Sequence, residues 1–200
     1  QKLLNPSLFY FDLGNNFPKP SEQGDLKIKL IQNALSKLPP DVVLVGPNEW
    51  QNGLHLLGEK IPYLLSNYDG IFNFLKSKTL KKKGQIISVF GYLSPNLVYQ
   101  NKNDPPSLLP VNKKMVKDWG KRFGSKTKGF KVLLFRGDVN ELQKFKDASL
   151  FDLIVVGSDN DNELNQVMEI RTKSGIFPMI PTKGQGILIA NISGSGKLIP

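Results

Sequence analysis

Cysteine is absent from this 200-residue chain, and histidine occurs only once. Without cysteine, disulfide bonds, thiolate metal sites and covalent attachment of c-type haem through this chain are excluded. No apolar run approaches the roughly 18 residues that cross a bilayer, so we expect no transmembrane segment. The first residues, Gln1–Pro6, also lack the longer apolar core of a signal peptide, which leaves open a mature form whose leader has been removed.

What is present is an ordinary globular composition with an excess of positive charge. Hydrophobic residues make up 40% of the chain and charged residues 22%, so the chain is expected to fold. Its length suits one domain, and no break in composition divides residues 1–200. Lysine and arginine number 27 against 17 aspartate and glutamate, and the resulting net charge of +10 favours acidic partners.

The hydrophobic patterns along the chain alternate between strand type and helix type. Short apolar runs predict strands at 8–13, 42–45, 61–67, 85–93, 130–135 and 151–156, and helical spacing predicts helices at 25–38, 53–60, 111–123 and 139–145. This alternation indicates an α/β fold. In the tail, the apolar pieces at 177–180, 186–192 and 197–200 predict antiparallel strands. Polar turns that follow parallel strands, such as Gly46–Glu49, converge on one crevice.

Six strand-and-turn segments, taken in their order along the chain, are similar to segments of a known protein family: 9–15, 41–50, 62–67, 84–95, 131–138 and 152–160. Together they resemble the metallophosphoesterase domain of the 5'-nucleotidase family, part of the calcineurin-like phosphoesterases. Phe9–Asn15 is similar to the family's strand ending in Asp-Ala-Gly-Asp, and Asp41–Trp50 to the strand ending in Gly-Asn-His-Glu-Phe. The resemblance implies an α/β fold of four layers, an αββα sandwich with mixed sheets. We expect the family's first strand to be missing.

The resemblance also implies a two-metal site whose ligands are Asp, Asn and His. In this chain, Asn15 stands in place of the bridging Asp, Pro47 in place of a metal-binding Asn, and Asn48 in place of the catalytic His. The full set of these vestigial positions is Asp12, Asn15, Pro47, Asn48, Gly137, Ser158 and Asn160. Independently of any alignment, one imidazole cannot assemble such a site, and we expect His55 to be partly buried or to cap a helix. We therefore predict no metal, no cofactor and no catalytic residue.

The leading prediction is a pseudoenzyme that serves as a structural or protein-binding subunit of a larger complex. The resemblance implies an extracytoplasmic location, and partners that are acidic or contain cytochromes. The surface for an acidic partner is predicted to comprise Lys81, Lys82, Lys83, Lys113, Lys114, Lys117, Lys121 and Arg122.

Two alternatives remain open. The first is a phosphohydrolase whose site is rebuilt around Asp12, Glu49 and Asp159. The second is a basic nucleic-acid-binding protein, for which the helix at 111–123 interleaves lysines with Trp119 and Phe123. We disfavour nucleic acid because these aromatic residues fit the apolar face of one helix, and lysines on the opposite face are the usual solvated surface.

Overall fold

The computed structural model describes residues 7–99, 107–124, 129–148 and 150–157, together with the strands at 168–172, 175–179, 191–192 and 198–199. Its first sheet is parallel and contains β1 (Phe11–Asp12), β2 (Val42–Leu44) and β3 (Tyr63–Leu64). The second sheet has the order β4 (Lys78–Lys82), β5 (Gln85–Leu93), β6 (Phe130–Arg136), β7 (Leu153–Val156). In it, β4 runs antiparallel to β5, and β5, β6 and β7 are parallel. Mixed sheets are therefore confirmed.

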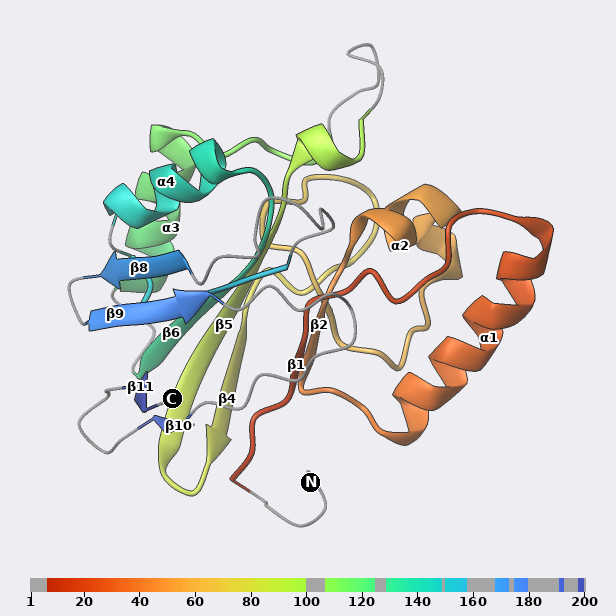
Figure 1. Ribbon diagram of the computed structural model, residues 1–200, viewed down its shortest axis with the longest axis horizontal. Helices are drawn as coiled ribbons and strands as arrows, with labels where there is room; N and C mark the ends of the chain where they lie inside the picture. Colours follow the sequence, from red (N-terminus) through yellow and green to blue (C-terminus); the bar gives the residue numbers. More distant parts are fainter. Residues whose placement is uncertain are drawn as a thin grey trace.

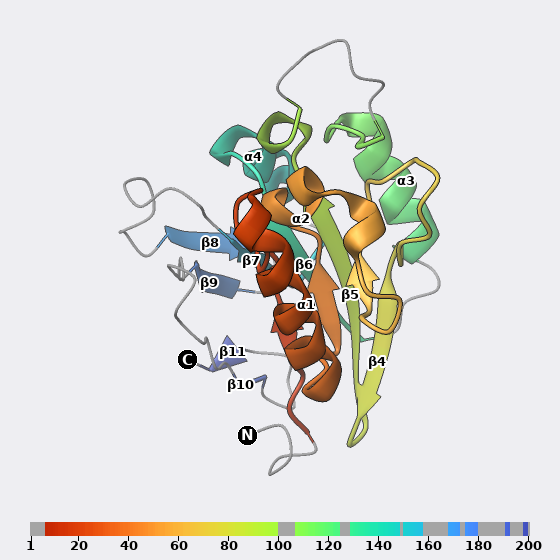
Figure 2. The same ribbon diagram turned by 90° about the vertical axis from the view of Figure 1, so that its right-hand side faces the viewer.

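Four α-helices among the described residues complete the layers. α1 (Glu22–Lys37) and α2 (Pro47–Asn52) lie on the side of the first sheet, whereas α3 (Lys113–Gly124) and α4 (Val139–Ala148) lie beside the second (Figure 1). The view turned by 90° shows α1 in front of the first sheet (Figure 2). Two antiparallel strand pairs follow in the tail: β8 (Met168–Thr172) with β9 (Gly175–Met179), and β10 (Asn191–Ile192) with β11 (Leu198–Ile199).

Strands β5, β6 and β7 of the second sheet are covered on both faces because their side chains alternate between two cores. On β5, Val89 and Leu93 belong to the core shared with the first sheet, whereas Phe90 and Tyr92 pack against α3 and α4. Strands β6 and β7 continue this alternation. The core shared with the first sheet includes Val132, Leu134, Leu153 and Val155, and the core beside α3 and α4 includes Leu133, Phe135, Ile154 and Val156. The αββα layering follows from this double burial.

The structure corrects the predicted elements around residue 50. The helix predicted at 53–60 is wrong: a single 3-10 turn, Leu54–Leu56, lies there, and α2 begins earlier, inside the expected polar turn. Proline suits the first position of a helix because its φ is already helical and its missing N–H is not needed there. Glu49 then accepts a hydrogen bond from the N–H of Gly46, the residue before the helix (3.0 Å). Pro47 therefore starts a helix at a place where the sequence indicates only a turn.

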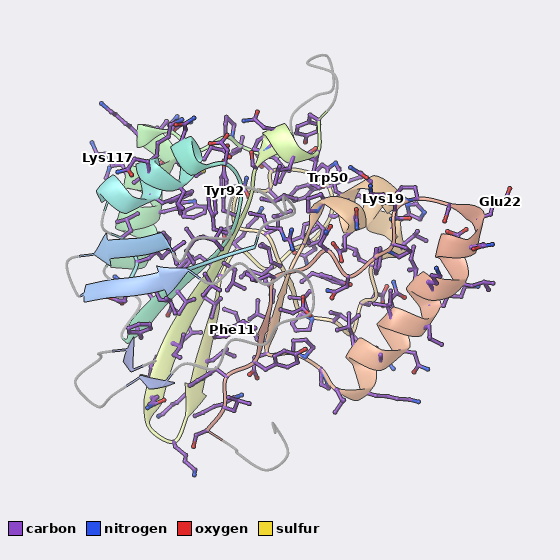
Figure 3. The ribbon with its side chains drawn as sticks, viewed as in Figure 1. Phe11, Lys19, Glu22, Trp50, Tyr92 and Lys117 are labelled. Atoms are coloured by element: carbon purple, nitrogen blue, oxygen red, sulfur yellow. The ribbon has the colours of Figure 1, made fainter. Side chains whose placement is uncertain are left out.

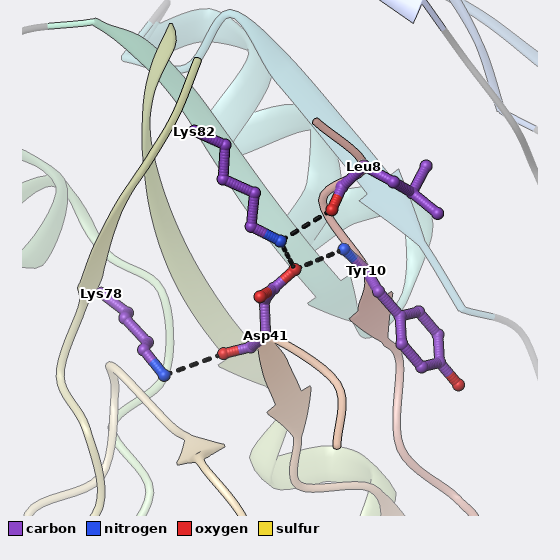
Figure 4. A network of polar contacts seen from close by, with 5 residues as sticks. All are labelled: Leu8, Tyr10, Asp41, Lys78 and Lys82. Carbon is purple, nitrogen blue, oxygen red and sulfur yellow. Dashed lines mark hydrogen bonds and ion pairs between the residues drawn. The ribbon is translucent and has the colours of Figure 1, made fainter. Parts of the chain in front are cut away.

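A lysine of β4 joins the two sheets at the amino-terminal ends of β1 and β2 (Figure 4). Lys82 Nζ donates to the carboxylate of Asp41 at 2.6 Å and to the carbonyl of Leu8 at 2.7 Å, and the Tyr10 N–H donates to the same carboxylate at 2.7 Å. The Lys82 and Asp41 side chains are only 19% and 12% exposed. Lys82, predicted as part of a partner surface, therefore makes an internal ion pair.

Candidate functional site

The carboxyl ends of β1 and β2 meet around the buried side chain of Glu49. This residue lies in the first turn of α2 and is 0% exposed. Backbone N–H groups surround its two oxygens: Asn15 (2.8 Å) and Gly46 (3.0 Å) donate to Oε2, and Asn16 (2.6 Å) and Phe17 (3.2 Å) donate to Oε1. A carboxylate offers about four acceptor positions. These four donors therefore satisfy Glu49 within the protein.

The loop that supplies three of these donors has an unusual backbone. Gly14 and Asn15 have φ values of 72° and 66°, in the left-handed region. Such conformations turn successive N–H groups toward one point, which creates a concave site for an anion. Here the anion is the protein's own Glu49 carboxylate. Burial raises the pKa of Glu49 above its usual range, and the backbone N–H groups act in the opposite direction.

The positions on these loops that the resemblance relates to the metal site are engaged in hydrogen bonds with one another and with the loop backbone. Asn15 Oδ1 accepts from the Asn48 N–H (3.0 Å), and Asn48 Nδ2 donates to the Phe17 carbonyl (2.8 Å). Asp12 Oδ1 accepts from the Gly14 N–H (2.7 Å) and from Asn16 Nδ2 (2.9 Å). The structure thus brings together the two strand ends that the sequence places in one crevice. Pro47 is buried beside them.

The remaining predicted positions lie elsewhere or outside the described residues. Gly137 directly follows β6, where an added Cβ would lie 2.7 Å from Glu141 Oε2. Ser158, Asn160 and Asp159 fall outside the described part of the chain. His55 is exposed in the 3-10 turn, so the expectation of partial burial is wrong. Its neighbours Leu54 and Leu57 take the apolar contacts instead.

Sequence reasoning missed Arg136, the last residue of β6. Its side chain is 6% exposed and reaches across to the end of β1, where Nε donates to the Leu13 carbonyl (2.8 Å) and Nη2 to the Gly14 carbonyl (3.3 Å). The only sequence signal was a charged residue closing an apolar strand, Phe130–Phe135, just before Gly137. These contacts place a permanent positive charge at the strand ends.

The two-metal centre that the resemblance implies does not fit these residues. In the described part of the chain, no group of three or more His, Cys, Asp or Glu side chains converges as a metal site. The Glu49 lone pairs are already used by backbone donors. The Arg136 guanidinium would also repel a second cation placed at the same strand ends. No catalytic step follows from this arrangement.

Two buried tyrosines lie near carboxylates. Tyr63 Oη has no hydrogen-bond partner among the described residues, and the pKa of Tyr63 is raised first by burial and then by the charges of Glu49 and Asp12. Tyr92 Oη donates to Glu141 Oε1 (2.8 Å) and accepts from the Val111 N–H (3.1 Å). Burial is the first cause that raises the pKa of Tyr92, and Glu141 adds to it.

We expect Tyr63 and Tyr92 to stay protonated in the folded chain above about pH 10, where an unperturbed tyrosine ionises. Because both folded-state pKa values lie above those of the unfolded chain, the unfolded chain loses these protons first. Folding stability should therefore fall as the pH rises above about 10. Tyrosinate absorbance during an alkaline titration checks this, and Tyr92→Phe should remove one late-titrating phenol. Ionisation of all tyrosines near pH 10 in the folded protein would contradict the assignment.

The predicted basic surface divides into two separate parts. Lys113, Lys114, Lys117 and Lys121 are exposed on α3, and Lys117 points away from the molecule (Figure 3). Lys81 and Lys83 are exposed at the turn between β4 and β5, which lies at the far end of the sheet (Figure 1). The Arg122 side chain is outside the described part. No helix in that part is long and apolar enough to cross a membrane.

No protein-family model and no curated protein matches the sequence, whereas the fold matches solved structures. The NAD nucleotidase NadN of Haemophilus influenzae aligns with a TM-score of 0.66 and 14% identity, over 96% of this chain and 44% of that one. A 5'-nucleotidase precursor of Thermus thermophilus aligns with a TM-score of 0.65 and 12% identity, over 95% of this chain and 43% of that one. The sulfate thiohydrolase SoxB of the same organism aligns with a TM-score of 0.60 and 17% identity, over 88% of this chain and 34% of that one.

This chain spans between a third and a half of the length of those three structures. At these identities the likeness concerns the fold. It agrees with the two sheets and the helical layers described above. The chain has the metallophosphoesterase-type fold of the 5'-nucleotidases and SoxB.

Proposed function

We propose that this chain is a non-catalytic metallophosphoesterase-like domain that serves as a structural or protein-binding subunit of a larger complex. The observation that carries the proposal is the enclosure of Glu49. Its carboxylate, which lies at the strand ends, accepts hydrogen bonds from four backbone N–H groups and is not presented to a ligand. The amide side chains of Asn15 and Asn48 are likewise used within the loops.

A hydrolysis assay tests the non-catalytic part of this proposal. The purified chain is incubated with nucleoside monophosphates, NAD and a chromogenic phosphodiester, with Mg²⁺, Mn²⁺ or Zn²⁺ added in turn. We expect no release above that of an Asp12→Ala variant prepared in the same way. Turnover that Asp12→Ala abolishes would instead support the alternative, a rebuilt phosphohydrolase site.

The basic face of α3 supports an acidic protein partner. Lys113, Lys117 and Lys121 are spaced four residues apart, so they lie along one side of the helix. The opposite side is apolar, and Met115 and Trp119 anchor it in the core. Following the resemblance, we place the complex outside the cytoplasm, with an acidic or cytochrome-containing subunit as the partner.

A second exposed surface lies on α1, on the other side of the molecule (Figure 1). Leu26 and Leu30 follow one another on its outer face and are 74% and 73% exposed. Neighbouring exposed leucines are characteristic of protein contact surfaces. Charges of both signs surround them, with Glu22 and Asp25 in the first turn and Lys27 next to Leu26, so this surface suits an apolar partner segment with margins of mixed charge. A subunit with contact surfaces on two sides fits a multi-subunit assembly.

Reversing the charge of the α3 face should remove the acidic partner without harming the fold. We expect the double variant Lys117→Glu, Lys121→Glu to lose the complex in size-exclusion chromatography, and to change folding stability by less than about 1 kcal/mol because the side chains are exposed. The matched control, Lys19→Glu, Lys60→Glu, has the same net charge, lies outside both proposed contact surfaces and tests whether the position matters. Equal loss in both variants would show a non-specific charge effect, and steeply salt-dependent binding of DNA or RNA would favour the nucleic-acid alternative.

A further inference from the structure

We infer that the Arg136 guanidinium is the resident cation of this crevice and takes the place of the metal ions that the fold implies. It joins the strand ends of the two sheets, so that the domain folds and remains stable without divalent metal. This inference concerns the crevice alone and does not depend on which partner the domain binds.

Arg136 contacts the ends of four strands. Its side chain donates to the carbonyls of Leu13 and Gly14 after β1. Its own carbonyl accepts a hydrogen bond from the Ser94 N–H at the end of β5 (2.8 Å). At the end of β7, a Cβ added to Gly157 would lie 3.0 Å from Arg136 Nε, so the guanidinium packs directly on that glycine. Arg136 is therefore the point at which β1, β5, β6 and β7 are fixed to one another.

The loop after β1 lies between two opposite charges. Its carbonyl groups at Leu13 and Gly14 point to the guanidinium, and its N–H groups from Asn15 to Phe17 point to the Glu49 carboxylate. Each set of peptide dipoles thus faces the charge that stabilises it. Arginine stays protonated at every physiological pH, so the positive charge is permanent. A divalent cation placed here would face that charge and carbonyl oxygens that already accept hydrogen bonds.

Thermal unfolding of the wild-type chain tests the inference without any substitution. The protein is measured after treatment with EDTA and again with millimolar Mn²⁺ or Zn²⁺. We expect the same unfolding midpoint in all samples. A midpoint that falls with EDTA or rises with either metal would overturn the inference, even if the chain hydrolyses no phosphate ester.

Substitutions separate the charge of Arg136 from its packing. Arg136→Met keeps the aliphatic stem and loses the charge, and we expect its midpoint to fall by roughly 5–10 °C. Arg136→Lys keeps the charge but not the planar fork, so its midpoint should lie between those of wild type and Arg136→Met. The control Lys121→Met removes an equal charge from the exposed face of α3 and should melt with the wild type. Equal falls in the midpoints of Arg136→Lys and Arg136→Met would show that the charge contributes nothing to stability. A wild-type midpoint in Arg136→Met would show the same. If Arg136→Met does not fold, the midpoint of Arg136→Lys and the EDTA and metal measurements on the wild type still test the inference.

Discussion

The Gly14→Ala variant is expected to lose at least about 3 kcal/mol of folding stability. Its added Cβ would lie 2.1 Å from the Leu44 carbonyl oxygen and 2.8 Å from the Gly46 nitrogen. Both atoms belong to backbone that cannot move without separating β1 from β2. The φ of 72° adds strain for any residue that carries a side chain.

Gly84→Ala is the matched control for this substitution. Gly84 has a similar φ of +81°, but nothing lies within 4 Å of the Cβ that alanine would add. Its cost should therefore come from the backbone conformation alone, about 1 kcal/mol. Urea denaturation of both variants measures the difference. Equal stability of the two variants would contradict the close packing of the loop after β1 against the end of β2.

We expect the second large effect at Glu49. Glu49→Gln replaces one carboxylate oxygen by an NH₂ group, which then faces backbone N–H donors and cannot accept their hydrogen bonds. Because the side chain is fully buried, we expect a loss of about 2–4 kcal/mol. Glu59→Gln makes the same change at an exposed position and should stay within about 0.5 kcal/mol of wild type.

The Glu49 substitution also separates two roles for this residue. A structural anion should affect the free energy of unfolding and leave phosphatase assays unchanged at background. A ligand of a rebuilt metal site would instead lose metal-dependent hydrolysis with little change in stability. Wild-type stability in Glu49→Gln, measured by denaturant unfolding, would contradict the internal role that its four backbone contacts assign to it.

Three strands of the second sheet, β5, β6 and β7, were predictable because they are continuous apolar runs, whereas the lysine-rich β4 is not such a run and was not predicted. The strand expected at 85–93 is β5 with the same bounds, and the strand expected at 130–135 is β6, which is one residue longer. A strand buried on both faces leaves such a run in the sequence, and no local alternative competes with it. The first sheet was harder to delimit, since β1 and β3 each contain only two residues.

The contacts that define the crevice were not predictable because they join distant parts of the chain. Glu49 receives N–H groups from 32 to 34 residues earlier, and Arg136 reaches carbonyls 122 and 123 residues away. No spacing rule marks such pairs. The sequence places Asn15 and Asn48 at two strand ends that share one crevice, and the structure adds their direct hydrogen bond. Their descent from metal ligands stays a proposal.

The metal content of the purified chain tests the central claim most directly. The protein is expressed with Mn²⁺ and Zn²⁺ in the medium, exchanged into metal-free buffer and measured by elemental mass spectrometry. Because Glu49 and the loop after β1 are occupied by internal hydrogen bonds and Arg136 supplies the positive charge, we predict far less than one divalent ion per chain. Retention of one or two ions per chain, lost on substitution of Asp12, would contradict the account.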